Sequence, residues 1–166
     1  MSKCLILMCG PSGAGKTTWA KKIIETFAKE NKGKIYHISR DEVRFSMLED
    51  DDEYFGKEDQ VFTEWIRQIQ THLDSDEDCY IIADATHLSE RSRNKTLDAL
   101  NISQDTKIIP VSAYPGIEKC LARNNNRSGR AFVPRSVIRR MCMQYEAPTS
   151  DEKYKYASIL FVVGED

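Results

Sequence analysis

A glycine-rich stretch near the N-terminus constrains the fold of this chain more than any other feature. Residues 10–17 read Gly-Pro-Ser-Gly-Ala-Gly-Lys-Thr, which fits the pattern G-x-x-x-x-G-K-[ST]. The apolar run 4–9 precedes this pattern, and residues 19–28 follow it with apolar side chains at helical spacing. The order of strand, glycine-rich turn and helix is the context in which the pattern forms a phosphate-binding loop. The alternative is a tight strand-to-helix turn with an incidental lysine.

Each part of this loop has a role in binding phosphate. The glycines let successive backbone N–H groups point inward, and the N-terminus of the following helix adds its dipole. Lys16 can reach the β- and γ-phosphates of a nucleotide, and the Thr17 hydroxyl can ligate Mg²⁺. The sequence therefore predicts a site for a nucleotide with Mg²⁺, formed by Gly10, Ser12, Gly13, Ala14, Gly15, Lys16, Thr17 and Thr18.

Length, charge and cysteine content restrict the class of protein. The chain has 166 residues, which fits one domain, 1–166, and its net charge of −2 requires any polyanion site to be a local patch. The five cysteines are an odd number on expected strands and helices, which indicates buried thiols in a reducing compartment. We identify no signal peptide and no apolar run near the ~20 residues that span a bilayer. We expect a cytoplasmic protein without membrane contact; the residues indicate no particular oligomeric state.

Apolar runs alternate with segments of helical spacing along the whole chain. The runs expected to be strands are 4–9, 35–38, 79–84, 107–113 and 159–163, and Pro110 indicates an edge or bulged position. Expected helices include 56–73, with Trp65 in the core, and a helix that Pro134 opens at its first position. This alternation predicts an α/β fold with a five-stranded, mostly parallel sheet and helices on both faces.

Polar residues follow the second expected strand. Residues 39–42 have the pattern S-x-x-E of a capping box, which opens a short helix. Asp41 and Arg44 then lie on one face of that helix. Because ligands bind at the carboxyl edge of an open α/β sheet, Asp41 is a candidate functional carboxylate beside the phosphate loop. The alternative is an acidic residue that the helix dipole favours near a helix N-terminus.

The third expected strand ends in Asp84. A carboxylate at this edge of the sheet could hold Mg²⁺ directly or through water. Thr86 and His87 follow on the same loop. We therefore expect this loop to contribute to the site.

A basic stretch lies in the C-terminal third of the chain. Between Lys119 and Arg140 there are seven cations and no acid. Arg123, Arg127 and Arg130 alternate there with asparagine, serine and glycine, a polar and mobile composition. This composition suits a lid, about 123–134, that closes arginines over transferring phosphates. The alternative is a basic, solvated helix face.

Four stretches of this sequence, in this order, resemble the polynucleotide 5′-hydroxyl kinase family, especially the kinase domain of the phage-type polynucleotide kinase-phosphatase. They are GPSGAGKTTWA at 10–20, ISRDEVR at 38–44, IIADATHLSERSR at 81–93 and RNNNRSGRAFVP at 123–134. Many NTPases share the first stretch, whereas the second and fourth narrow the choice. A wider group of small P-loop kinases, including some that act on metabolites or aminoacyl-tRNA, has similar pieces.

The resemblance implies a P-loop NTPase with an adenylate kinase-like lid that transfers the γ-phosphate of ATP to the 5′-hydroxyl end of DNA or RNA, an activity of nucleic acid repair. Its catalytic residues would be Lys16, Asp41 and Arg127, with Asp41 as the general base that accepts the proton of the attacking hydroxyl. Arg123 and Arg127 would contact ATP, and Thr17 would contact the metal. The residues assigned to the acceptor are Arg44, Asp84, Thr86, His87 and Arg130, of which Arg44 would hold the neighbouring phosphate.

Three departures from the family pattern are visible. The family has an asparagine near Thr86-His87, and the lid is one residue longer here. No D-x-D-x-T follows any expected strand, so no phosphatase domain is expected. Two alternatives stay open: a kinase for a small metabolite or an aminoacyl-tRNA, and a nucleotide-dependent binding module, which would not need the pair Asp41 and Arg44.

Overall fold

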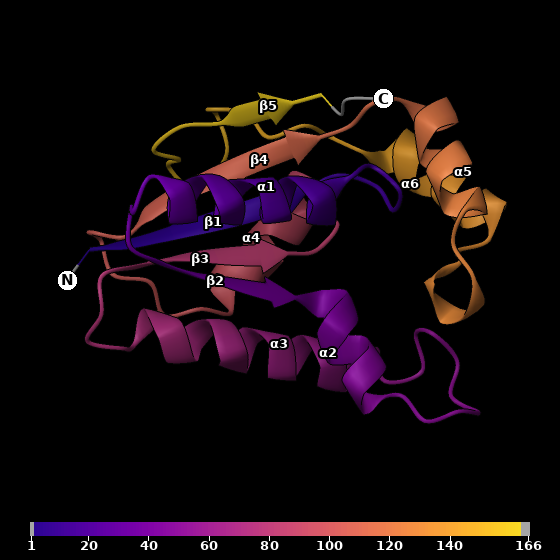
Figure 1. Ribbon diagram of the computed structural model, residues 1–166, viewed down its shortest axis with the longest axis horizontal. Coiled ribbons are helices and arrows are strands. Elements are labelled where there is room, and N and C mark those ends of the chain that lie inside the picture. Colours follow the sequence, from indigo (N-terminus) through magenta and orange to yellow (C-terminus); the bar gives the residue numbers. More distant parts are fainter. Residues whose placement is uncertain (1, 164–166) are drawn as a thin grey trace.

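Five parallel strands form the centre of the protein, shown as a computed structural model that describes residues 2–163 (Figure 1). The strands are β1 (Lys3–Cys9), β2 (Lys34–Ser39), β3 (Cys79–Asp84), β4 (Lys107–Ala113) and β5 (Leu160–Val162). Their order in the sheet is β2-β3-β1-β4-β5, and every neighbouring pair is parallel. The structure thus confirms the predicted α/β fold.

Helices connect the strands and cover the sheet. They are α1 (Lys16–Lys29), α2 (Arg40–Met47), α3 (Glu58–Leu73), α4 (Glu90–Asp98), α5 (Ile117–Asn125) and α6 (Arg135–Gln144). A short 3₁₀ helix, η1 (Gly129–Ala131), lies between α5 and α6. Within residues 2–163 no helix combines the length and the apolar character needed to cross a bilayer.

Central strand β1 is buried on both faces, because successive side chains of a strand point to opposite sides. Leu5 and Leu7 pack with α3 and α4, while Ile6 and Met8 pack with α1. Trp65 of α3 lies in the first of these cores, as predicted, and its indole N–H donates to the carbonyl of Ile38 over 2.9 Å. All five cysteines are buried and none forms a disulfide, which also agrees with the sequence prediction.

Of the two expectations about prolines, the one for Pro110 holds locally and the one for Pro134 needs correction. Pro110 lies in β4, which is not an edge strand, since β5 pairs with it. However, β5 pairs only with residues 111–113, so β1 is the single strand neighbour of the first part of β4 in the described chain. On the other side of Pro110, no described strand needs the backbone N–H that proline lacks. Pro134 is the N-cap of α6 and precedes its first helical residue, Arg135.

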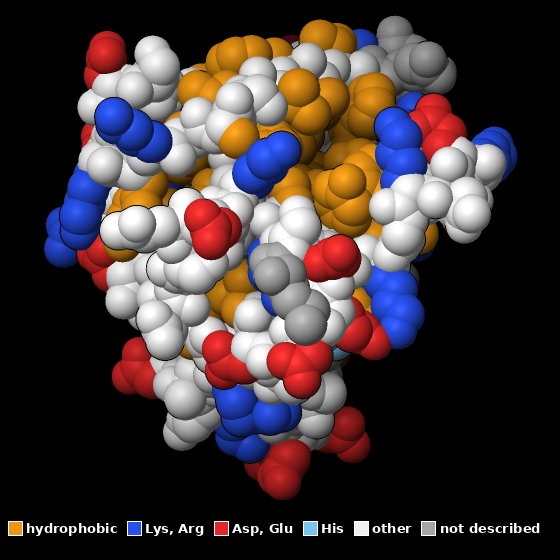
Figure 2. Space-filling model, turned by 90° about the vertical axis from the view of Figure 1, so that its left-hand side faces the viewer, with side chains coloured by type: hydrophobic (Ala, Val, Ile, Leu, Met, Phe, Trp, Pro, Cys, Tyr) orange, Lys and Arg blue, Asp and Glu red, His pale blue; other side chains and the backbone are white. Residues whose placement is uncertain are grey.

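The loops that carry the candidate site residues leave the carboxyl ends of the strands. Helices α2, α5 and α6 lie at this end of the molecule (Figure 1). Helix α2 begins there because the Ser39 hydroxyl accepts a hydrogen bond from the N–H of Glu42 over 3.2 Å, as the capping pattern predicted. At the opposite end, shown in Figure 2, cations and anions are interspersed and no large basic patch is visible.

Candidate functional site

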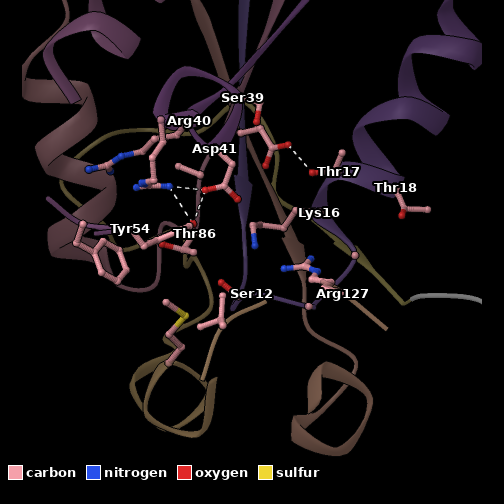
Figure 3. A pocket seen from close by; sticks show the side chains of 18 of the residues that line it. Ser12, Lys16, Thr17, Thr18, Ser39, Arg40, Asp41, Tyr54, Thr86 and Arg127 are labelled. Carbon is pink, nitrogen blue, oxygen red and sulfur yellow. Dashed lines mark hydrogen bonds and ion pairs between the residues drawn. The ribbon is translucent and has the colours of Figure 1, made fainter. Parts of the chain in front are cut away.

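A pocket opens at the carboxyl edge of the sheet, between the loops after β1, β2 and β3 and the segment after α5 (Figure 3). It brings together most of the residues that the sequence singled out. These are Ser12, Gly13, Gly15, Lys16, Thr17, Thr18, Asp41, Arg44, Asp84, Thr86 and Arg127. Gly10, Ala14, Arg123, His87 and Arg130 do not line this pocket.

The phosphate loop lies so close to its neighbours that two positions require glycine. A Cβ atom on Gly10 would lie 2.1 Å from the carbonyl oxygen of Ala113 at the end of β4. A Cβ atom on Gly13, whose φ is +82°, would lie 2.5 Å from the carbonyl oxygen of Cys120 in α5. Gly10 and the buried Ala14 therefore shape the loop from beneath rather than line the pocket.

Lys16, the first residue of α1, occupies the centre of the pocket. Its ammonium group donates to the carbonyl oxygen of Pro11 over 2.9 Å, so the side chain folds back over the loop. Burial lowers the pKa of Lys16, while the charges of Asp84 and Asp41 act in the opposite direction. In Figure 3 its ammonium lies between Asp41 and Arg127. The Lys16 ammonium is therefore placed to bind an anion in the pocket.

Asp84 and Thr17 form an oxygen-rich corner. The Thr17 hydroxyl donates to Asp84 Oδ2 over 3.1 Å, and His37 Nε2 lies 2.9 Å from the same oxygen. Burial raises the pKa of Asp84, but the hydrogen bond from His37, the charge of Lys16 and the bond from Thr17 outweigh it, and the net pKa is lowered. A carboxylate beside a hydroxyl is the donor set that Mg²⁺ prefers. Thr17 and Asp84 therefore fit a divalent cation.

His37 had no sequence signal beyond its place near the end of an apolar run. It reaches Asp84 because β2 and β3 are adjacent and in register, with His37 opposite Ile82 and Ser39 opposite Asp84. Strand adjacency is not encoded locally, so sequence reasoning missed this contact.

Asp41 lies in the first turn of α2 and lines the same pocket as Thr17 and Asp84. Its side chain is 55% exposed, so a substrate hydroxyl can reach it. The Tyr54 hydroxyl donates to Asp41 Oδ1 over 2.6 Å, and Arg44 forms an ion pair with the same carboxylate. These partners fix one oxygen of Asp41 and hold the carboxylate toward the pocket.

Arg44 is buried and fully engaged. Its side chain is only 5% exposed, and Glu58 accepts hydrogen bonds from it over 2.8 and 2.9 Å. The guanidinium also donates to the Tyr54 hydroxyl over 3.0 Å and lies over the Tyr54 ring. For Arg44 to bind an acceptor phosphate, as the resemblance implies, one of these partners would have to release it. Glu58, which sequence reasoning missed, is an acid in the first turn of α3.

The loop after β3 divides its residues between pocket and core. Thr86 lines the pocket, and its carbonyl oxygen accepts a hydrogen bond from the N–H of Gly10 over 2.8 Å. His87 is instead buried, with Nδ1 2.7 Å from the carbonyl oxygen of Met8 and Nε2 3.0 Å from the Thr96 hydroxyl. Both ring nitrogens have partners inside the protein, so the structure does not support contact between His87 and an acceptor.

The three arginines predicted in the lid point to different places. Arg127 lines the pocket, and its charge acts on Lys16. Arg123 lines a neighbouring hollow with Gly13 and Gly15, and its Nη1 lies 3.4 Å from the carbonyl oxygen of Gly13. Arg130 lies outside the pocket and donates to the carbonyl oxygen of Glu49 in the acidic loop. Arg123 and Arg127 thus flank the phosphate loop, whereas Arg130 connects the lid segment to the loop after α2.

Buried Asn124 holds together the two ends of the segment that the sequence predicts to be a lid. Its amide donates to the carbonyl oxygen of Val133 over 2.6 Å and accepts from the N–H of Val133 over 3.0 Å. This pair brings the two ends of segment 124–133 together. The run of three asparagines looked like a mobile loop in the sequence, and nothing in it distinguished Asn124 from its neighbours.

Solved structures similar to this chain share its fold. Kti12 of Chaetomium thermophilum in complex with ADP-AlF3 matches with a TM-score of 0.68 at 16% identity, over 98% of this chain and 90% of that one. A chain of the Pnkp1/Rnl/Hen1 RNA repair complex matches with a TM-score of 0.67 at 21% identity, over 86% of this chain and 43% of that one. A gluconokinase from Sinorhizobium meliloti 1021 matches with a TM-score of 0.57 at 18% identity, over 95% and 81%.

At these identities the likeness shows an α/β P-loop NTPase fold. No curated protein sequence matches the chain. The sequence profile of the AAA domain matches residues 5–148, a stretch that contains the phosphate loop, Asp41, Asp84 and the arginines at 123, 127 and 130. The protein therefore belongs to the AAA domain family.

Proposed function

We propose that this protein is a kinase that transfers the γ-phosphate of ATP to the 5′-hydroxyl end of a nucleic acid. The proposal rests on one observation, a single pocket that has two halves. Lys16, Thr17, Asp84 and Arg127 form a half suited to the phosphates of a nucleotide, and Asp41 faces them from the other half. Phosphoryl transfer needs this combination, because the protein mainly positions the reactants and neutralises charge.

The donor half supplies positive charge. Lys16 would contact the β- and γ-phosphates, and Arg127 would approach the transferring group from the lid segment. Thr17 and Asp84 would hold Mg²⁺, which neutralises phosphate charge when bound. The backbone N–H groups of the glycine-rich loop and the N-terminus of α1 would complete the cradle.

The acceptor half supplies Asp41. As the oxygen of the 5′-hydroxyl forms its bond to the γ-phosphorus, the bond from that phosphorus to the bridging oxygen breaks and ADP leaves. The hydroxyl proton passes to the free oxygen of the Asp41 carboxylate. Tyr54 and Arg44 hold the other oxygen, so the carboxylate is oriented before the acceptor arrives.

Three features support a nucleic acid as the acceptor. The motifs at 38–44 and 123–134 resemble those of polynucleotide 5′-hydroxyl kinases. One structural neighbour belongs to an RNA repair complex. The exposed carboxylate of Asp41 at the pocket mouth suits a chain end that extends away from the protein.

A kinase for a small polyol or metabolite is the second candidate, and one specific observation favours it. Arg40 and Arg44, the two arginines of the acceptor half, are both paired with Glu58. The acceptor half therefore offers little net charge to a phosphate next to the hydroxyl, which suits an acceptor that carries no phosphate. The fold likeness to a gluconokinase is compatible with this candidate.

A panel of acceptors separates these candidates. Transfer of labelled γ-phosphate from ATP with Mg²⁺ is measured for a 5′-hydroxyl oligonucleotide, a 3′-phosphorylated mononucleoside, a plain nucleoside and gluconate. We expect phosphorylation of the oligonucleotide and of the mononucleotide, with little of the nucleoside and none of gluconate. Transfer to gluconate alone would favour the second candidate. ATP binding without transfer to any of these four acceptors would favour a binding module.

Substitution of Asp41 tests its role. Asp41→Asn is expected to bind ATP as the wild type does but to lose transfer by roughly 10²–10⁴-fold, because the proton acceptor is removed. Asp51→Asn, in the exposed acidic loop, is the matched control and should keep full activity. Unchanged turnover of Asp41→Asn would exclude Asp41 as the base.

A further inference from the structure

Aromatic side chains gather beside the acceptor half of the pocket. Phe55 is 52% exposed and Phe45 is 37% exposed, although phenylalanine is among the residues most often buried. Phe55 and its neighbour Tyr54 lie in the loop between α2 and α3, and both line the pocket with Asp41. An exposed ring in the wall of a polar pocket needs an explanation other than core packing.

Tyr54 is fixed in place by two contacts. Its hydroxyl donates to Asp41, and its ring packs against the guanidinium of Arg44, whose central carbon lies 4.4 Å from the ring centroid. The Phe55 ring meets the Tyr54 ring edge to face, with centroids 4.6 Å apart and an interplanar angle of 84°. Phe55 is thus held by a rigid neighbour while half of its side chain stays open to solvent.

We propose that Phe55 is a stacking platform for the base of the terminal nucleoside of the acceptor. This inference rests on the proposed function, because the occupant is placed by its 5′-hydroxyl at Asp41. Tyr54 links Asp41 directly to Phe55, so the ribose would bridge from the carboxylate to the aromatic wall. A nucleobase offers the flat π-face that such a ring can stack on, whereas a sugar acid or a polyol offers none.

Stacking predicts a particular kind of specificity. Every base has a π-face, so a stacking platform tolerates all four bases and adds affinity without reading sequence. The platform therefore acts on acceptor binding, and its loss should appear in KM for the acceptor rather than in kcat or in KM for ATP.

The test compares two oligonucleotide acceptors of the same length, one with a normal 5′-terminal nucleoside and one with an abasic 5′-terminal sugar. In the wild type we expect a KM roughly 5- to 100-fold higher for the abasic acceptor. Phe55→Ala should raise KM for the normal acceptor by a similar factor and leave KM for the abasic acceptor unchanged. Phe55→Trp should keep the wild-type preference. Phe161→Ala, which removes an exposed ring on β5, is the matched control and should change neither value.

Each outcome decides the proposal. If Phe55→Ala alters KM for both acceptors equally, or if the wild type accepts the abasic end as well as the normal one, the platform is refuted while the kinase function stands. If the wild type phosphorylates neither oligonucleotide, the proposed function fails and the platform with it.

Discussion

The buried pair Arg93 and Glu152 leads to a large and specific stability prediction. Arg93 of α4 is 0% exposed, and its Nε and Nη2 donate to Glu152 over 2.8 and 2.7 Å. Its Nη1 donates to the carbonyl oxygens of His87 and Glu146 over 3.0 and 2.9 Å. The pair therefore connects the segment after α6 to the loop that carries Thr86. In Glu152→Ala the guanidinium would stay buried without a counter-charge.

The loss of folding stability in Glu152→Ala follows from the burial of both partners of the ion pair. Removal of one partner of a buried ion pair destabilises a protein by about 3–5 kcal/mol, because the remaining charge is uncompensated. At about 2–4 °C per kcal/mol for a domain of this size, the melting temperature should fall by roughly 6–20 °C. Lys153→Ala is the matched control, since Lys153 pairs with Asp98 at 2.9 Å on the surface, where solvent screens the ion pair and its loss has little effect on stability.

Urea unfolding, followed by the fluorescence of the two tryptophans, Trp19 and buried Trp65, and by circular dichroism, measures both variants. The wild type also has a pH signature. Burial raises the pKa of Glu152, but hydrogen bonds from Arg93 and Tyr156 outweigh it, so the pKa in the folded state is below its ordinary value. The stabilisation is therefore complete above about pH 4.3 and is lost as the pH falls through the folded pKa, a dependence that Glu152→Ala should lack. A loss below 1 kcal/mol in Glu152→Ala, equal to that of Lys153→Ala, would refute the reasoning.

Two further predictions concern His87, in the loop after β3, and Asp84, at the end of that strand. Burial lowers the pKa of His87 to about 4, so between about pH 6.5 and 4 the unfolded state binds a proton that the folded state does not. The free energy of unfolding should therefore fall by about 3 kcal/mol as the pH falls across this range. Urea unfolding at pH 5 and pH 7 measures this change, which should be much smaller in His87→Gln. An equal change in both proteins would contradict the assignment. Asp84→Asn should weaken binding of ATP with Mg²⁺ by about 10- to 100-fold but leave binding of metal-free ATP nearly unchanged, measured by calorimetry with and without EDTA. An equal loss in both conditions would place Asp84 outside the metal site.

The parts of this structure that the sequence predicted depend on local patterns. The phosphate loop, the strand before it and the cap at Ser39 are each set by residues within a few positions, so they could be recognised. Asp84 was found because a strand that ends in a carboxylate delivers it to the ligand edge.

The missed contacts depend on tertiary structure. Glu58 reaches Arg44 across the loop between two helices, and His37 reaches Asp84 only because their strands are neighbours in the sheet. His87 follows Thr86 in sequence, yet its φ of +41° and its two internal hydrogen bonds place the ring in the core. Adjacency in sequence therefore did not predict which side of the loop each side chain occupies.

The position of β1 in the sheet has a consequence for synthesis of the chain. β1 is made before both of its partners, β3 and β4, and its first partner in register, Cys79, follows Lys3 by 76 residues. At about 5–20 residues per second, the ribosome needs roughly 4–15 s to supply that partner. During this interval residues 4–9, an uninterrupted apolar run, have no strand to pair with. The strand that supports the phosphate loop thus stays without its native partners while the chain is made, and unpaired apolar strands of this kind are prone to aggregation and are bound by chaperones.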